Sequence, residues 1–394
     1  MHHQPEFDPT AGLENPIGFF RSYGGTIDVL AGSPGRVNLI GDHIDYCGGT
    51  VLPMAIERFC FAAVISGECD PGTCVVSSLD HPDNAVIDVG RPITAETAGA
   101  AGGWTRYVLG VAAQIQRRHP LGALGGCRVA VKSTVPIGAG LSSSAALEVS
   151  VALAMLGRIG FTLGGLGLAE MCRRAEHEFA GVPCGLMDQA AVVLAEAGNA
   201  LELDCATRRH RQVRLPDQIR ISIIDSKVRH TLADGEYRRR QEACEHAARL
   251  LGVQDLAHAP AGAGDKMPDE YRRYVRHVQT EQARVIEFVR SFEDGNIERA
   301  GALMWASHAS LRDDYRVSCE PVDAIVESLA GRPGIVGARM TGGGFGGCVV
   351  VMHTPDAEDE VTNIAQRCAP GESPLPVITT RAAEGAKQLP TVPR

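Results

Sequence analysis

The chain has 394 residues, 44% hydrophobic and 22% charged, which is typical of globular proteins and favours two domains over one large α/β domain. Its formal net charge of −9 argues against nucleic acid or an anionic membrane as the main partner. The sequence has no run of eighteen apolar residues and no basic-then-apolar N-terminal pattern. We therefore expect neither a transmembrane helix nor a signal peptide, and a cytoplasmic location.

Hydrophobic periodicity predicts the elements of the first half of the chain. Extended segments are expected at residues 29–40 (interrupted by Gly32-Ser33-Pro34-Gly35), 51–64 (a pair of strands), 127–132, 200–205 and 219–226. Helices are expected at residues 104–117, 142–156, 166–180 and 187–195. The charged stretch 208–214 separates the last two strands, and we take it as the candidate domain boundary.

The second half is mainly helical. Helices are expected at residues 235–251, 268–294, 296–312 and 358–367, with strands at 335–340 and 348–353 on either side of a glycine-rich turn. The Ala/Gly-rich segment 259–266 is expected to be a loose surface loop. These elements indicate an α/β or α+β protein with mixed sheets.

Twelve cysteines are scattered along the chain without a C-x-x-C pair. In a cytosolic protein of this size most cysteines act as small buried hydrophobic residues. The spacing therefore gives little support to a structural zinc site.

The most informative segment joins a glycine-rich turn to a helix-forming run through seven residues, Gly138, Ala139, Gly140, Leu141, Ser142, Ser143 and Ser144. Such a junction leaves backbone N–H groups unpaired at a helix start and adds the positive end of the helix dipole. A nucleotide phosphate is the natural occupant, and the serine hydroxyls can donate to it or ligate a divalent cation. No Gly-Lys-Ser/Thr follows the glycines, so this is not the common P-loop. A serine-capped helix start without a ligand is the alternative.

A second cluster lies where a predicted strand becomes a turn, at Arg36, Asp42, His43 and Asp45. Carboxylates a few residues apart in a loop suit contacts to neighbouring sugar hydroxyls. The alternative is a solvated turn in which Asp45 caps a local N–H group.

Three further segments carry weaker evidence. Asp188 follows Gly185 and begins a predicted helix, where a first-turn acid is also common for structural reasons. Glu176 could equally belong to a surface charge pattern with its arginine neighbours. The glycine run in 337–348 permits close backbone approach, and Tyr237 lies just inside a predicted helix.

Taken together, these segments resemble the galactokinases of the GHMP small-molecule kinase superfamily. Residues 35–49 nearly reproduce the opening motif of that family. Further matches follow in order at residues 184–189, 229–233 leading to Tyr237, 307–314 and 338–341. The resemblance covers about residue 17 to the last strand. It implies an α+β, two-domain GHMP kinase fold with mixed sheets, domains at 1–212 and 213–394, and an active site in the cleft between them.

The resemblance also implies a role for each matched position. Asp188 and Arg36 match the catalytic pair. The positions matching sugar contacts are Asp42, His43, Ile44, Asp45, Gly185 and Tyr237. Gly138 to Ser144 match the loop around the ATP phosphates, Trp104 falls where an aromatic residue lines the adenine pocket, and Ser144 and Glu176 match the Mg²⁺ ligands. The implied activity is phosphorylation of the C1 hydroxyl of D-galactose with ATP and Mg²⁺. The implied partners are the sugar and ATP, and the oligomeric state is left open, a monomer being compatible.

The opening motif departs from the family at three positions. Asp42 stands where galactokinases usually have Glu, and Ile44 and Cys47 replace the usual Thr and Asn. Residues 43–48 are closer to N-acetylgalactosamine kinases, although Gly49-Thr50 follows the galactokinase pattern. A 1-kinase for N-acetylgalactosamine or for a C6-altered galactose therefore remains an alternative. So does a non-catalytic galactose sensor, although the complete serine loop argues against it.

Overall fold

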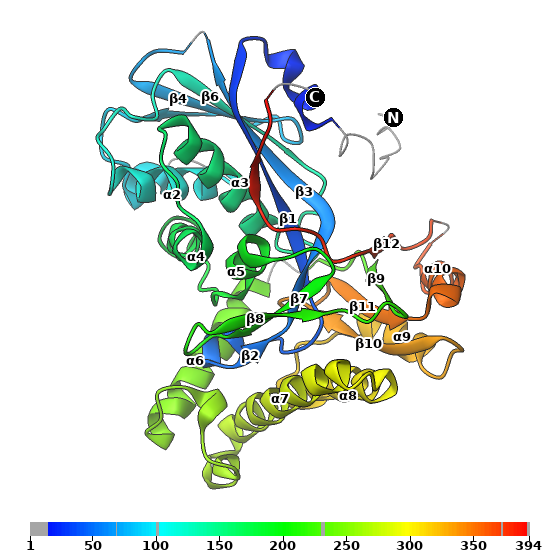
Figure 1. Cartoon of the computed structure of the whole chain (residues 1–394). Coiled ribbons are helices and arrows are strands. Elements are labelled where there is room, and N and C mark those ends of the chain that lie inside the picture. The colour runs from blue at the N-terminus through cyan, green and yellow to red at the C-terminus, as the bar shows by residue number, and fades with distance from the viewer. Residues whose placement is uncertain (1–14, 68, 100–101, 230–232, 372, 392–394) are drawn as a thin grey trace.

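The structure is a computed structural model that describes residues 15–67, 69–99, 102–229, 233–371 and 373–391 (Figure 1). The described strands form three sheets of six, four and three strands. All twelve cysteines lie in the described part of the chain and are free. A search of the described helices finds none with the length and apolar character needed to cross a membrane.

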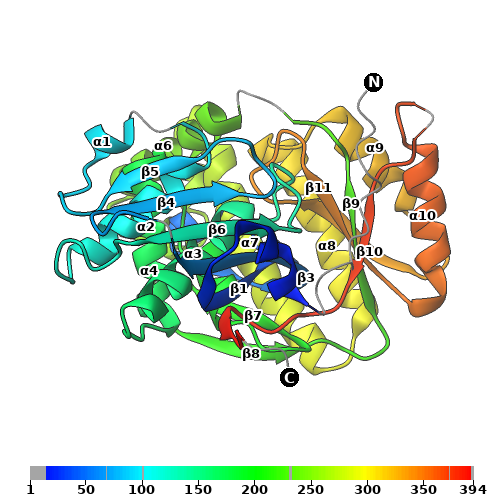
Figure 2. The ribbon, with the colours of Figure 1, turned by 90° about the horizontal axis from the view of Figure 1, so that it is seen from above.

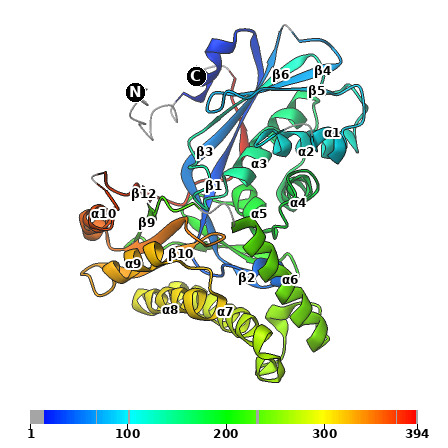
Figure 3. The same ribbon diagram turned by 180° about the vertical axis from the view of Figure 1, so that it is seen from behind.

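The largest sheet is built mainly from the first third of the chain. Its strands lie in the order β13 (Lys387–Leu389), β1 (Thr26–Asn38), β3 (Pro53–Ser66), β6 (Cys127–Ser133), β4 (Thr73–Ser78) and β5 (Ala85–Asp88). β1 and β3 pair antiparallel along almost their whole length, whereas β4 and β6 are parallel. Helices α3 and α5 pack on one face of this sheet, and α1, α2 and α4 form a further layer on the same side, as Figure 3 shows from behind. Their bounds are α1 (Ala95–Gly99), α2 (Thr105–Gln116), α3 (Ser143–Arg158), α4 (Gly165–Ala175) and α5 (Met187–Leu194).

The second sheet belongs to the last part of the chain. It has the order β10 (Ile335–Thr341), β11 (Cys348–His353), β9 (Arg220–Asp225) and β12 (Val377–Thr380), with all pairs antiparallel. The remaining helices are α6 (Ala233–Leu251), α7 (Asp269–Glu293), α8 (Ile297–Ser310), α9 (Glu320–Leu329) and α10 (Glu358–Arg367). α8, α9 and α10 pack against this sheet, and α7 packs along α8 (Figure 2).

The third sheet, β2 (Thr50–Val51), β7 (Asn199–Asp204) and β8 (His210–Arg214), connects the two parts of the molecule. β2 follows directly on the loop that carries the second charged cluster, and α7 packs against β2 and β8. β8 is most of the charged stretch that we took for a boundary. Its charged side chains are exposed while Val213 is buried, so the stretch is a strand with one solvated face rather than a linker. The division at residue 212 stays a prediction.

The predicted helices agree with the observed ones to within a few residues. The helix expected at 166–180 ends in a π-helical turn, Glu176–Ala180, and that at 296–312 continues into a second one, Leu311–Tyr315. The loose loop expected at 259–266 is wrong in its second half, because Ala263 and Gly264 are buried in a short 3₁₀ turn against α7. Small side chains allow that close backbone contact.

Candidate active site

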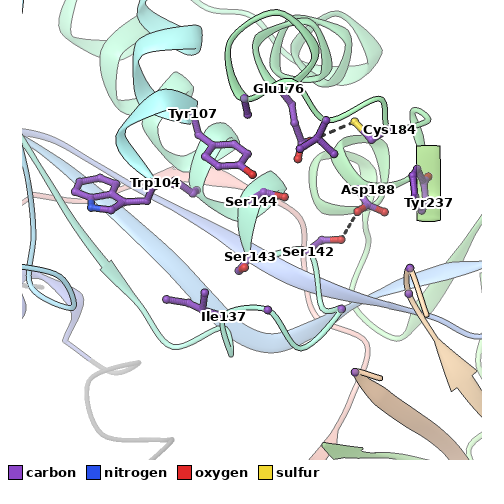
Figure 4. A pocket seen from close by; sticks show the side chains of 18 of the residues that line it. Trp104, Tyr107, Ile137, Ser142, Ser143, Ser144, Glu176, Cys184, Asp188 and Tyr237 are labelled. Atoms are coloured by element: carbon purple, nitrogen blue, oxygen red, sulfur yellow. Dashed lines mark hydrogen bonds between the residues drawn. The ribbon is translucent and has the colours of Figure 1, made fainter. Parts of the chain in front are cut away.

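A cavity of about 890 Å³ brings together residues from both halves of the chain. Trp104 and Tyr107 lie at one end, Tyr237 at the other, and the three serines between them (Figure 4). The predicted residues that line it are Arg36, Asp42, His43, Asp45, Trp104, Gly138, Gly140, Ser142, Ser143, Ser144, Glu176, Asp188 and Tyr237. Four others, Ile44, Ala139, Leu141 and Gly185, lie outside the lining.

Asp188 is fixed from both sides. Arg36 donates to its Oδ1 from Nε at 2.9 Å and from Nη2 at 2.7 Å, and Ser142 donates from its hydroxyl to Oδ2 at 2.5 Å. Burial works against the charge of Arg36, but the carboxylates of Asp188 and Asp42 outweigh it and raise the pKa of the guanidinium. The pair is therefore a charged, preorganised unit at the wall of the cavity.

The phosphate loop is held against β1 and against the glycine-rich turn. The N–H of Arg36 donates to the Leu141 carbonyl at 3.1 Å, and Arg36 Nη1 donates to the Gly140 carbonyl at 2.5 Å. A Cβ on Gly342 would lie 2.8 Å from the Gly140 carbonyl oxygen, so the two loops touch backbone to backbone. Ser142 has a φ of 54°, and α3 begins at Ser143 with its N-terminus at the cavity. A helix N-terminus at a cavity wall suits an anion, and the binding of a phosphate there stays a prediction.

Glu176 lies beside Ser144 at the cavity wall. Gln189 Nε2 donates to its Oε2 at 2.6 Å, and the Cys184 thiol donates to the same oxygen at 3.3 Å. Burial, together with the charge of Asp188, raises the pKa of Glu176 to about 7. A hydroxyl and a crowded carboxylate on one cavity wall fit Mg²⁺, which takes one or two protein oxygens plus phosphate oxygens.

The opposite end of the cavity offers groups suited to a polyol. Burial, and the neighbouring charge of Asp188, raise the pKa of Asp45 to about 7. The His43 ring, whose pKa burial lowers well below its ordinary value, accepts from or donates to the Tyr46 hydroxyl at 2.9 Å through Nδ1. Its Nε2 is buried without a partner among the described residues. Tyr237 packs 5.5 Å from the His43 ring, centroid to centroid. A sugar would find an acceptor, a neutral imidazole and an aromatic face here.

Asp42 differs from its neighbours because its carboxylate is engaged within the protein. Its Oδ2 pairs with Arg339 Nη2 at 2.6 Å, with both side chains almost fully buried, and its Oδ1 accepts from the Gly342 N–H at 3.2 Å. Burial raises the pKa of Asp42 in spite of the opposing charge of Arg339. A sugar contact by Asp42 would have to compete with this buried pair.

Helix α7 fastens the same loop from the other side. Glu281 accepts from the Gly41 N–H at 3.0 Å, His277 Nε2 lies 3.2 Å from the Asp42 carbonyl oxygen, and Gln282 accepts from the Thr50 N–H at 2.7 Å. The second half of the chain therefore fixes the backbone of the predicted sugar loop.

The predicted residues outside the cavity lining pack against other parts of the protein. Ile44, Ala139 and Leu141 are buried, and a Cβ on Gly49 would collide with the Ile44 side chain. Gly185 lies directly against the Asp45 carboxylate, which leaves no room for a side chain. A direct contact of these residues with a ligand stays a prediction, and for Ile44 it would have to come from the backbone.

The far end of the cavity is aromatic. Trp104 stands at the start of α2, near-parallel to His81 at 6.3 Å between ring centroids, and Tyr107 and the exposed Ile137 complete this end. Flat, apolar walls of this kind suit a nucleobase.

Sequence reasoning missed four residues that matter to this geometry. Arg339 lay in a quoted motif without a role, and Gln189 directly follows the candidate base. Glu148 is one turn after Ser144 on α3, a spacing that could have signalled a shared face. Arg229 lines the cavity near Gly138 and pairs with Asp225 at 2.7 Å, while residues 230–232 of its motif lie outside the described residues.

Comparisons with known proteins identify the family of the chain. The family model "GHMP kinases N terminal domain" matches residues 106–196, "Galactokinase galactose-binding signature" matches 18–65, and "GHMP kinases C terminal" matches 288–370. The galactokinase of Thermotoga neapolitana is 38% identical over 330 residues, covering 84% of this chain and 90% of that protein. The Bos taurus galactokinase is 37% identical over 383 residues, covering 94% and 95%.

Among solved structures, Lactococcus lactis galactokinase complexed with galactose superimposes with a TM-score of 0.84 at 27% identity, covering 92% of this chain and 95% of that one. The GHMP kinase fold that the motifs implied is thereby confirmed. The chain belongs to the galactokinase family of the GHMP kinases.

Proposed function

We propose that this chain transfers the γ-phosphoryl group of ATP to the C1 hydroxyl of D-galactose, giving galactose 1-phosphate and ADP. One observation carries the proposal. The Asp188 carboxylate, held by Arg36 and Ser142, stands between the serine-lined phosphate loop and the polar end of the same cavity. A nucleotide and a sugar bound at these two ends would meet at Asp188.

Asp188 would accept the proton of the C1 hydroxyl as its oxygen attacks the γ-phosphorus. Phosphoryl transfer has a loose transition state, so positioning and charge stabilisation supply most of the catalysis. Three hydrogen bonds hold the Asp188 carboxylate in one orientation, so much of its role would be to orient the hydroxyl. Arg36 would stabilise charge on the transferring group.

Ser144 and Glu176 would hold Mg²⁺, whose chemistry when bound is to neutralise charge on the β- and γ-phosphates. The support is the oxygen donor set, a serine hydroxyl and a carboxyl group on one wall of the cavity. Gly138 to Ser144 would bind the phosphates through backbone N–H groups and hydroxyls, with Trp104 and Tyr107 beside the base.

At the sugar end, Asp45 would accept hydrogen bonds from sugar hydroxyls, His43 would offer its free Nε2, and Tyr237 would cover a face of the ring. These groups discriminate by hydrogen bonding, which penalises a sugar that lacks the matching hydroxyl. We also propose a cytoplasmic location, where ATP is available. Both substrates would fit within a single copy of the chain, so the proposal needs no partner subunit.

The test is ADP release measured with galactose, N-acetylgalactosamine, glucose and galacturonate as acceptors. We expect the highest kcat/KM with galactose. A higher kcat/KM with N-acetylgalactosamine would overturn the choice of sugar, and ADP release with none of the four would favour the sensor.

A further inference from the structure

Behind the cavity wall, one buried amide bridges two buried carboxylates. Gln189 Nε2 donates to Glu176 Oε2 at 2.6 Å and to Glu148 Oε2 at 3.1 Å. Gln189 and Glu148 are fully buried, and Glu176 is 4% exposed. Both N–H bonds of the amide are used in this way, so Gln189 fixes the two carboxylates relative to each other.

The sequence positions of Glu148 and Gln189 connect this bridge to the residues that line the cavity. Ser144 and Glu148 are four residues apart on α3 and therefore lie on one face, one turn above the other. Asp188 and Gln189 are consecutive on α5, so their side chains diverge by about 100°. Asp188 faces the cavity, while Gln189 points back to Glu176 on the π-helical turn. The bridge thus joins the helix that begins at the phosphate loop, the helix that carries the candidate base and the turn that carries Glu176.

Packing alone does not account for the bridge. A buried carboxyl without full hydrogen bonding costs free energy, and Glu148 Oε1 and Gln189 Oε1 have no partner among the described residues. An apolar side chain at position 148 or 189 would avoid that cost. What the polar pair adds is a hydrogen bond to Glu176 Oε2, beside the one from the Cys184 thiol, that holds the carboxyl group in a fixed orientation.

We propose that Gln189 is a positioning residue that sets the orientation of the Glu176 carboxylate toward Mg²⁺, and that Glu148 anchors Gln189. The inference rests on the proposed function, because it assumes that Glu176 binds the cation. Outer-shell partners of this kind change metal affinity by about 10- to 100-fold when removed.

The experiment compares Gln189→Met, which keeps the size of the side chain but removes both donors, with Glu148→Met and Glu148→Gln. Gln114→Met on α2 is the matched control, because Gln114 is also a buried glutamine but lies outside the cavity lining. We expect Gln189→Met to raise the Mg²⁺ concentration for half-maximal activity by about 10- to 100-fold, with the KM for galactose within about twofold of wild type. Glu148→Met should show a similar shift. Glu148→Gln should restore near-normal Mg²⁺ dependence, since an amide oxygen still accepts from Gln189.

A readout without turnover separates this inference from the proposed function. Calorimetric titration with ATP, with and without Mg²⁺, measures how much the cation strengthens nucleotide binding. That gain should shrink in Gln189→Met while binding of free ATP is unchanged, whatever sugar the enzyme uses. Unaltered Mg²⁺ dependence of both binding and turnover in folded Gln189→Met, or an equal shift in Gln114→Met, would overturn the proposal. If Gln189→Met does not fold, the contrast between the two Glu148 variants decides by the same criteria.

Discussion

Asp188→Asn tests the centre of the proposed mechanism because it removes a charge while nearly preserving shape. The asparagine oxygen can keep both hydrogen bonds from Arg36, and the Ser142 hydroxyl can turn to accept from the new amide. Removing one partner of a buried ion pair costs about 3–5 kcal/mol. Two hydrogen bonds survive and the Asp188 side chain is 24% exposed, so we expect about 2 kcal/mol and a folded protein that melts at a lower temperature.

The effect on catalysis should be larger than the effect on stability. Loss of the proton acceptor and orienting charge should lower kcat by about 10²- to 10⁴-fold, which corresponds to about 2.7–5.4 kcal/mol in activation free energy. The assay is ADP release by purified variant whose fold is checked by circular dichroism. Glu170→Gln is the matched control, because Glu170 forms a part-buried pair with Arg173 at 2.8 Å outside the cavity lining. A kcat within threefold of wild type in Asp188→Asn would remove Asp188 from the mechanism.

Three further predictions follow from the geometry. Burial and the charge of Asp188 raise the pKa of Asp45 to about 7. Protonation of Asp45 therefore contributes stability that is fully present below about pH 4 and is lost as the pH rises through about 7. The melting temperature of the unliganded protein should therefore fall across that range, and less steeply in Asp45→Asn; equal slopes would contradict this. Ser144→Ala should weaken activity in a way that higher Mg²⁺ partly restores, and an unchanged Mg²⁺ titration would count against a ligand role. Gly342→Ala places a Cβ 2.8 Å from the Gly140 carbonyl at a φ of 86°, so the KM for ATP should rise by about tenfold; an unchanged KM for ATP would mean that the contact does not shape the phosphate loop.

Helices α2 to α8 and α10 were predicted from the sequence because apolar side chains recur in them with a period of about 3.6 residues, whereas α1 and α9 were not predicted. α7 is an example, since its buried residues Val275, Val278, Val285 and Val289 recur at helical spacing. β8 was not predicted because it lacks a detectable hydrophobic period. Only Val213 of that strand is buried, so its exposed charged residues looked like a linker. Edge strands with one buried side chain give too weak a pattern for a period of two to be detected.

In the candidate site, local motifs could be predicted from the sequence, whereas contacts between distant residues could not. Glycine and serine junctions are local, so the phosphate loop could be predicted from the seven residues Gly138 to Ser144 alone. The bridge from Gln189 to Glu148 and the pair of Asp42 with Arg339 join residues 41 and 297 positions apart, and each buries groups that composition alone assigns to the surface. The sequence of one helix or strand shows its hydrophobic period, but it does not show which distant residue will pair with a buried charged group.

Asp42 shows what this means for the choice of sugar. Asp42 is one methylene shorter than the glutamate that galactokinases usually have at this position, which shortens its reach toward a sugar hydroxyl. In the structure its oxygens already pair with Arg339 and with the Gly342 N–H, and breaking a buried pair costs more than one sugar hydrogen bond returns. Asp42 would then act on the sugar indirectly, by fixing the loop that carries His43 and Asp45 against the glycine-rich turn. Discrimination between galactose and its relatives should accordingly depend on Asp45 and His43, and an exchange of Asp42 for glutamate should alter stability more than the ranking of acceptors.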